Sequence, residues 1–208
     1  MSATTRIASS AILVLALAGC GGGDGGSGGQ ETPDCTAFPP AAGSPYRLPW
    51  HVGQAWQANP HLVRDSSVQR YAIDVAMPIG TDVLAIRAGR VVRVEQSYFD
   101  GDNTFGHENH VLVQHDDGTV ARYFHLTHQG ALVLVGEAVD QGQRIGLSGH
   151  TGNSSQPHLH FDVTRSCCTT PPNYNELPAG ETLPLTFRNA SPDTSCGLEF
   201  GVRYTAQP

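Results

Sequence analysis

The amino-acid sequence predicts a mainly β domain built of antiparallel strands. From Tyr71 onward, short runs rich in Val, Ile and aromatic residues are separated by Gly or Asp-Gly turns, the pattern of strands and hairpins. The segment HDDGT, 115–119, is a strong hairpin signal, because Asp and Gly tolerate the positive φ angles of a tight turn. No segment keeps helical periodicity for three turns. We therefore expect an antiparallel β domain from about Trp50 to Val163.

The expected strands follow one another along the chain. In the domain they are the runs 71–78, 83–96, 110–126, 130–149 and 157–163. The tail holds two further candidates, 184–190 and 198–206. At 208 residues the chain fits one domain of ordinary size. A net charge of -7 without any Lys/Arg run argues against nucleic acid as a partner, because phosphate binding needs a clustered basic surface.

Residues 1–19 have the features of a lipoprotein signal peptide. Arg6 precedes an apolar run, 11–19, that is too short to span a bilayer. The sequence LAGC, 17–20, overlaps the end of this run. It resembles the lipobox of bacterial lipoproteins, whose cysteine, here Cys20, carries the lipid. An ordinary cleaved signal that happens to contain a cysteine is the alternative. We expect lipidation at Cys20, an N-terminal lipid anchor in a membrane of the cell envelope, and exposure on the periplasmic or extracellular side.

A Gly-rich tether, 20–45, is expected after the anchor, because its Gly-rich part cannot bury enough apolar surface to fold. Four further cysteines in an exported protein suggest disulfides: Cys35, Cys167, Cys168 and Cys196. A bond between the neighbours Cys167 and Cys168 would strain the peptide, so each is expected to pair with Cys35 or Cys196, in either arrangement. A four-cysteine zinc site is the competing interpretation, although no CxxC pair is present.

Two histidines stand one residue apart in the run SSQPHLHFDV, 154–163. Because alternate strand residues share a face, His158 and His160 lie on one side, roughly 7 Å apart at about 3.3 Å per residue. This spacing suits one metal ligand and one acid-base group at the same cleft. On its own the pair also fits two solvated side chains. The small-residue loop before it, 146–153, leaves room for a ligand.

The run GLSGHTGNSSQPHLHFDV, 146–163, resembles the signature of the M23 zinc metallopeptidases, the lysostaphin- and LytM-like peptidoglycan endopeptidases. Three more segments fit that family in order: 71–92, 109–126 and 135–149. The resemblance implies a two-sheet antiparallel β domain with a groove, of the duplicated hybrid motif type. We place this M23-like domain at 46–166 and expect a disulfide-linked C-terminal β extension at 167–208.

The resemblance also implies roles for individual residues. His160 and Asp74 match zinc ligands of the family, and His125 and His158 match its two catalytic histidines. A catalytic zinc takes three protein ligands and keeps one position for water, whose pKa it lowers toward about 7. One of the two catalytic histidines is then expected to take the proton of that water and the other to stabilise the oxyanion or protonate the leaving amine. The sequence does not assign these two tasks.

One ligand position departs from the family pattern. The usual motif is HxxxD, but Arg70 stands four residues before Asp74, and a guanidinium cannot ligate zinc. The replacement that we expect is His61, thirteen residues before Asp74 in a loop ahead of the strand, with His51 in reserve. His150 lies where the family often has a small or polar residue near the groove, so a binding role is also open.

The resemblance implies a Zn²⁺-dependent endopeptidase that hydrolyses peptide bonds of peptidoglycan stem or cross-bridge peptides. The sequence does not distinguish glycyl-glycine bonds from D-alanyl-diaminopimelate bonds. The alternative is a degenerate M23 domain without catalysis, which binds the cell wall or activates other murein hydrolases. Degenerate members tend to lose the HxH pair or the YxHL histidine, and both are present here; only Arg70 favours the alternative.

Overall fold

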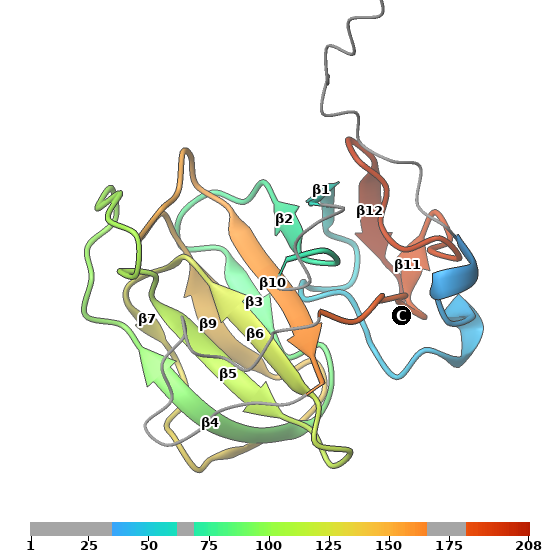
Figure 1. Ribbon diagram of the computed structural model, residues 1–208, viewed down its shortest axis with the longest axis horizontal. Coiled ribbons are helices and arrows are strands. Elements are labelled where there is room, and N and C mark those ends of the chain that lie inside the picture. Colours follow the sequence, from blue (N-terminus) through green and yellow to red (C-terminus); the bar gives the residue numbers. More distant parts are fainter. Residues whose placement is uncertain (1–34, 62–68, 166–181) are drawn as a thin grey trace, which may run out of the picture.

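The computed structural model describes residues 35–61, 69–165 and 182–208. Within these ranges the chain forms twelve strands and two short 3-10 helices, and the strands make two antiparallel sheets (Figure 1). The predicted fold class, a mainly β protein with two antiparallel sheets, is confirmed. The two sheets differ in size, and the larger one carries Asp74 and His160, two of the expected zinc ligands.

Nine strands form the larger sheet. In spatial order they are β11 (Ala190–Ser191), β12 (Arg203–Ala206), β1 (Ala55–Pro60), β2 (Ile73–Val75), β10 (Leu159–Thr164), β6 (Val120–Phe124), β5 (His110–Gln114), β4 (Gly89–Glu95) and β8 (Ala138–Val139). The smaller sheet has the order β3 (Asp82–Leu84), β9 (Arg144–Ser148) and β7 (Leu126–Ala131).

The run 83–96, expected as one strand, holds the end of β3 and the whole of β4, which belong to different sheets. The chain crosses between the sheets just before Gly89. A Cβ at Gly89 would lie 2.3 Å from the carbonyl oxygen of Gln114, so the backbone of β4 approaches β5 more closely than any other residue allows. The hydrophobic pattern alone does not mark this crossing, because apolar residues occur in both strands and in the segment between them.

The hydrophobic core contains side chains of both sheets. Tyr123 and Phe161 of the larger sheet belong to the same buried cluster as Val83 and Ile145 of the smaller sheet. Since strand residues alternate between faces, the neighbours of Tyr123 and Phe161 point to the other side of the larger sheet. That outer face carries an unusual set of buried polar side chains, namely His110, Arg122, His160 and Asp162.

The C-terminal extension continues the larger sheet. β12 pairs with β1, with Thr205 opposite Ala55, and β11 pairs with β12. The candidate strand 184–190 reaches strand conformation only at its last residue, as the start of β11. Residues 35–45, placed in the expected tether, form η1 (Cys35–Ala37) and η2 (Ala41–Gly43), and the hydroxyl of Ser44 donates a hydrogen bond to the carbonyl of Thr186.

Cys35 and Cys196 form a disulfide. The expected pairing of each of them with Cys167 or Cys168 was therefore wrong, and so was the four-cysteine zinc alternative. The reason is tertiary: the β1–β12 pairing brings the C-terminal segment beside the N-terminal one, where a Cβ on Gly197 would meet the ring of Phe38 at 2.4 Å. Cys167 and Cys168 lie outside the described residues.

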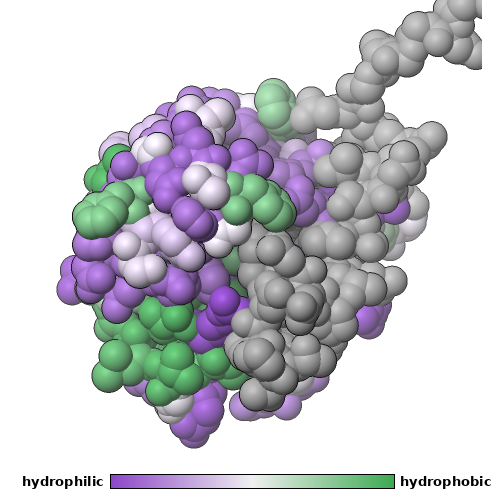
Figure 2. Space-filling view, turned by 60° about the vertical axis from the view of Figure 1, so that its left-hand side comes forward, coloured by the Kyte–Doolittle hydropathy of each residue, from purple (hydrophilic) through white to green (hydrophobic). Residues whose placement is uncertain are grey.

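In Figure 2, which brings the β4 and β7 side of the molecule forward, polar side chains cover most of the upper part and hydrophobic ones gather lower down. Three large exposed hydrophobic residues lie between β7 and β8: Leu132, Leu134 and Val135. None of these three lines the pocket described below. Among the described residues no helix has the length and hydropathy to cross a bilayer. The expected signal peptide and Cys20 lie outside those residues.

Candidate metal centre

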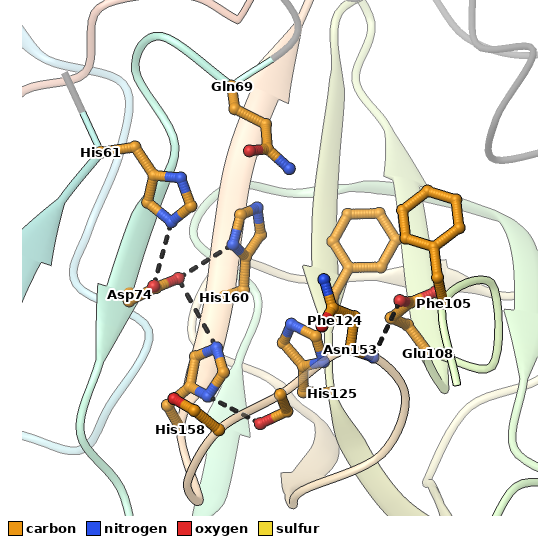
Figure 3. Close-up of a pocket in the computed structure, with 12 residues that line it drawn as sticks. His61, Gln69, Asp74, Phe105, Glu108, Phe124, His125, Asn153, His158 and His160 are labelled. Atoms are coloured by element: carbon orange, nitrogen blue, oxygen red, sulfur yellow. Dashed lines mark hydrogen bonds and ion pairs between the residues drawn. The ribbon is translucent and has the colours of Figure 1, made fainter. Parts of the chain in front are cut away.

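Three side chains from different strands or strand ends meet on the outer face of the larger sheet (Figure 3): His61, Asp74 and His160. One ligand atom of each lies within 4.8 Å of the other two. Asp74 is central, with its Oδ2 3.0 Å from Nε2 of His61 and its Oδ1 2.9 Å from Nδ1 of His160. The two imidazole rings stand edge to face, 5.0 Å apart. The structure thus brings the predicted ligand set together.

Strand pairing positions these three groups. β2 lies between β1 and β10, and His160 is directly opposite Asp74 in the β2–β10 pair. On the other side Asn59 is opposite Asp74. His61 is two residues beyond Asn59, so it is on the same face, and its backbone N–H donates to the carbonyl of Ala72. A residue distant in sequence is therefore placed beside Asp74 by backbone hydrogen bonds.

Arg70 occupies the position at which the HxxxD motif has its histidine. Arg70 is exposed in the turn before β2, with its guanidinium 5.5 Å from the ring centre of Tyr71. The reserve candidate, His51, lies elsewhere, with its Nε2 3.0 Å from Oδ2 of Asp82. Of the two histidines considered, only His61 reaches Asp74.

The ionisation of the group follows from burial and mutual contact. Burial alone raises the pKa of Asp74, but the contacts of its carboxylate with His160 and His61 outweigh it and hold that pKa well below its usual range. Burial alone lowers the pKa of His160, yet the Asp162 and Asp74 carboxylates stabilise the imidazolium and raise its pKa to about 9. The cluster therefore stabilises positive charge at the point where its ligand atoms meet.

Two further histidines, His125 and His158, lie beside this group, with their ring centres 4.4 Å apart. Nδ1 of His125 lies 2.6 Å from the carbonyl oxygen of Thr151, and Nδ1 of His158 lies 2.8 Å from that of Gln156. A carbonyl only accepts, so each Nδ1 carries the proton and each Nε2 has a lone pair. Nε2 of His158 is 3.7 Å from Oδ1 of Asp74. The strand spacing thus places His158 and His160 at one site, but the Nδ1 atoms of the two rings have different partners.

His125 has an unusual backbone conformation, with φ of 61°. It stands between β6 of the larger sheet and β7 of the smaller one, where the chain passes from one sheet to the other. Left-handed φ values cost energy for a residue with a Cβ, and they persist only where the surroundings enforce them. Here the hydrogen bond to Thr151 and the bond from Leu126 N–H to the carbonyl of Asn109 hold the turn.

Both of these histidines are neutral near pH 7. Burial, together with the charges of the nearby His158 and His160, lowers the pKa of His125 to about 3. Burial also lowers the pKa of His158, and the Asp74 carboxylate opposes this shift. Each Nε2 therefore has a free lone pair at neutral pH.

The five residues line a pocket of about 200 Å³. Sequence reasoning missed the other residues that line it, Gln69, Phe105, Glu108, Phe124, Asn153, Ser154 and Ser155. Glu108 is buried, and its Oε1 accepts hydrogen bonds from the backbone N–H groups of Gly106 and Asn153. It joins the β4–β5 loop to the β9–β10 loop, which rise at the same end of the sheet in Figure 1. No recognisable motif in the sequence signals these contacts.

Two other histidines near the site, His150 and His107, have partners outside the ligand group. His150 does not line the pocket, and its Nδ1 lies 2.9 Å from the hydroxyl of Ser154. His107 pairs with Asp102 at 2.7 Å and stacks on Tyr98. The structure therefore does not put the imidazole of His150 on the pocket wall, and its expected role in binding stays a prediction.

The family model described as Peptidase family M23 matches residues 68–172, which are 105 of the 208 residues. The chain belongs to peptidase family M23. The resemblance noted in the sequence is thereby confirmed, and it covers Asp74, His125, His158 and His160. His61 lies seven residues before the matched range.

Individual members of the M23 family are similar to this chain over about half its length. A peptidoglycan DD-endopeptidase, ShyA of Vibrio cholerae, is 42% identical over 103 residues, which are 50% of this chain and 22% of ShyA. The glycyl-glycine endopeptidase ALE-1 of Staphylococcus capitis is 34% identical over 123 residues, 58% of this chain and 32% of ALE-1. The catalytic domain of lysostaphin from Staphylococcus simulans is 30% identical, with a TM-score of 0.42 over 62% of this chain and 86% of that domain. The match to ShyA spans about a fifth of that protein's length.

The residues present fit a zinc ion. Two imidazoles and one carboxylate are a common ligand set of catalytic zinc sites, which keep a fourth position open. Nε2 of His61 is buried and makes no hydrogen bond of ordinary geometry within the described part of the chain, although it points at Asp74. A metal ligand position satisfies such a nitrogen without requiring a proton on it.

Zinc binding should release a proton from His160. The pKa of this residue is raised to about 9, so at about pH 7.5 it is protonated until the metal takes the lone pair. Protons therefore compete with zinc, and we expect zinc affinity to fall by about tenfold for each pH unit below 9. Calorimetric titration in buffers of different ionisation enthalpy measures the release; about one proton per zinc is expected, and no release at pH 7.5 contradicts the assignment of His160.

Replacing His61 should remove the metal while leaving the fold intact. We expect His61→Ala to lose stoichiometric zinc after dialysis, because two remaining ligands bind zinc too weakly. His51→Ala and Arg70→Ala serve as matched controls and should keep one zinc per chain. Metal content measured by atomic emission checks this result. Full zinc retention in His61→Ala would show that the third ligand comes from another residue.

Proposed function

We propose that this M23 protein is a zinc-dependent endopeptidase that cleaves peptide bonds of peptidoglycan stem or cross-bridge peptides. One observation carries the proposal: the ligand group of His61, Asp74 and His160 shares a pocket with the neutral histidines His125 and His158. A metal site and two proton acceptors in one pocket are the parts that peptide hydrolysis requires.

His61, Asp74 and His160 would hold the ion. Zinc, when bound, supplies the positive charge that activates water near neutral pH and polarises a scissile carbonyl. Asp74 is the anionic ligand, and the two histidines bind as neutral imidazoles, so the loaded group keeps a net positive charge. Oδ1 of Asp74 is also 3.7 Å from Nε2 of His158, so the ligand group lies directly beside the acid-base pair.

His125 and His158 move the proton. Each presents Nε2 as an acceptor, because its Nδ1–H is engaged by a backbone carbonyl. The nitrogen that accepts the proton of the attacking water becomes an N–H donor. It is then able to stabilise the negative carbonyl oxygen or to protonate the leaving amine. The fixed Nδ1 contacts keep both rings oriented through this cycle, so neither ring has to turn.

Peptidoglycan is the substrate class supported by the relatives. ShyA is a peptidoglycan DD-endopeptidase and ALE-1 a glycyl-glycine endopeptidase, so both bond types are candidates here. The proposed lipid anchor at Cys20 and the Gly-rich tether would hold the domain next to the cell wall, in the envelope. The alternative is a non-catalytic M23 domain, and only Arg70, which cannot ligate zinc, favoured it. Because His61 lies beside Asp74 and offers a replacement ligand, Arg70 is a weaker argument for that alternative.

Loss of either acid-base histidine should stop hydrolysis without loss of zinc. We expect wild-type protein to cleave purified peptidoglycan, and His125→Ala and His158→Ala to be at least about 100-fold slower, the usual loss when a general acid-base group is removed. Mass spectrometry of the released peptides, from walls with direct cross-links and walls with glycine bridges, identifies the bond.

His51→Ala is the control for the two variants and should match the wild type. Each protein is assayed for zinc alongside activity. Zinc-loaded wild-type protein that releases no new termini from either wall type would contradict the proposal and favour the non-catalytic alternative.

A further inference from the structure

We infer that Asp162, held by Arg122, is a positioning residue that orients His160 as a metal ligand. The inference rests on the proposed function, because it concerns the same metal site. It assigns a role to a buried ion pair on the outer face of the larger sheet, which is close to the pocket but does not line it.

The ion pair is defined by the strand register. Asp162 is two residues beyond His160 on β10, so both side chains are on one face, and Arg122 on β6 is directly opposite Asp162. Nε of Arg122 donates to Oδ1 of Asp162 at 2.6 Å and Nη2 donates to Oδ2 at 2.7 Å. Only 2% of the Arg122 side chain and none of that of Asp162 is exposed. This two-point contact fixes the plane of the carboxylate.

His160 lies between two carboxylates. Its Nδ1 is 2.9 Å from Oδ1 of Asp74, the other predicted ligand, and its Nε2 is 3.6 Å from Oδ2 of Asp162. If Nδ1 faces the ion, Nε2 carries the proton and faces Asp162. Ligating histidines commonly direct the second ring nitrogen at a carboxylate, which selects the tautomer and raises the basicity of the ligand.

Phe124 completes the support. It is directly opposite His160 on β6, and its ring centre is 5.7 Å from that of His160. The guanidinium of Arg122 is 5.5 Å from the centre of the same ring. Arg122 thus contacts both the carboxylate that faces His160 and the aromatic ring beside it. The three side chains limit the rotation of the imidazole.

Fold stability alone does not account for the ion pair. A buried pair such as Arg122–Asp162 pays a large desolvation cost, and apolar residues of similar volume often give equal or greater stability. An aliphatic pair, however, has no group that attracts the Nε2 proton of His160. Arg122 also neutralises Asp162, so the pair orients His160 without adding net negative charge near the ligands.

The test compares zinc affinity in three variants of the full chain, measured by competition with a chelator of known affinity. Asp162→Asn keeps the shape and removes the charge. The double variant Arg122→Met with Asp162→Leu replaces the pair by apolar residues and removes both charges. Asp82→Asn, at a partly exposed carboxylate paired with Arg144 and His51, is the control. Thermal unfolding shows that each variant is folded.

We expect Asp162→Asn and the double variant each to bind zinc about 10- to 100-fold more weakly than wild type, the range found for outer carboxylates of metal sites. The control should bind like wild type. Wild-type affinity in Asp162→Asn overturns the inference. So does wild-type affinity in the double variant alone, because the loss in Asp162→Asn would then come from the Arg122 charge that remains in that variant. If wild type itself binds no zinc, the proposed function fails and this inference fails with it.

Discussion

The pairing of β2 with β1 on one side and β10 on the other is the constraint on which the site depends. It places Asp74 between two imidazoles, with His160 opposite it and His61 just past the end of β1. Backbone hydrogen bonds, rather than a short helical or loop motif, set these distances. The C-terminal extension contributes indirectly, because β12 pairs with the first part of β1 and so gives that strand a neighbour on both sides.

Three histidines of the site, which have the same intrinsic chemistry, have different hydrogen-bond partners and different pKa shifts. In His160, Nδ1 faces Asp74, and the neighbouring carboxylates raise its pKa to about 9. In His125 and His158, Nδ1 is engaged by a backbone carbonyl, and burial lowers both pKa values. The same residue type thus has a raised pKa in one place and a lowered pKa in another. The difference comes from the partner of Nδ1.

Sequence reasoning found those parts of the site that short motifs specify. Asp74 and His160 lie in recognisable runs on neighbouring strands, so their meeting could be anticipated. The displaced ligand His61 could be suggested only because Arg70 cannot serve, and its position depends on strand register that no local pattern reveals. The disulfide was mispredicted because the tail strand that brings Cys196 to Cys35 pairs across most of the chain length. Glu108 gave no signal, since its contacts join two loops that meet only in the fold.

The central claim is that His61, Asp74 and His160 form one zinc site. Anomalous X-ray diffraction at the zinc edge, from crystals of the zinc-loaded protein, tests it most directly. A single peak within about 2.0–2.2 Å of one atom from each of these three side chains is the expected result. A peak ligated by His125 or His158 in place of His61, or no peak at Asp74, would contradict it.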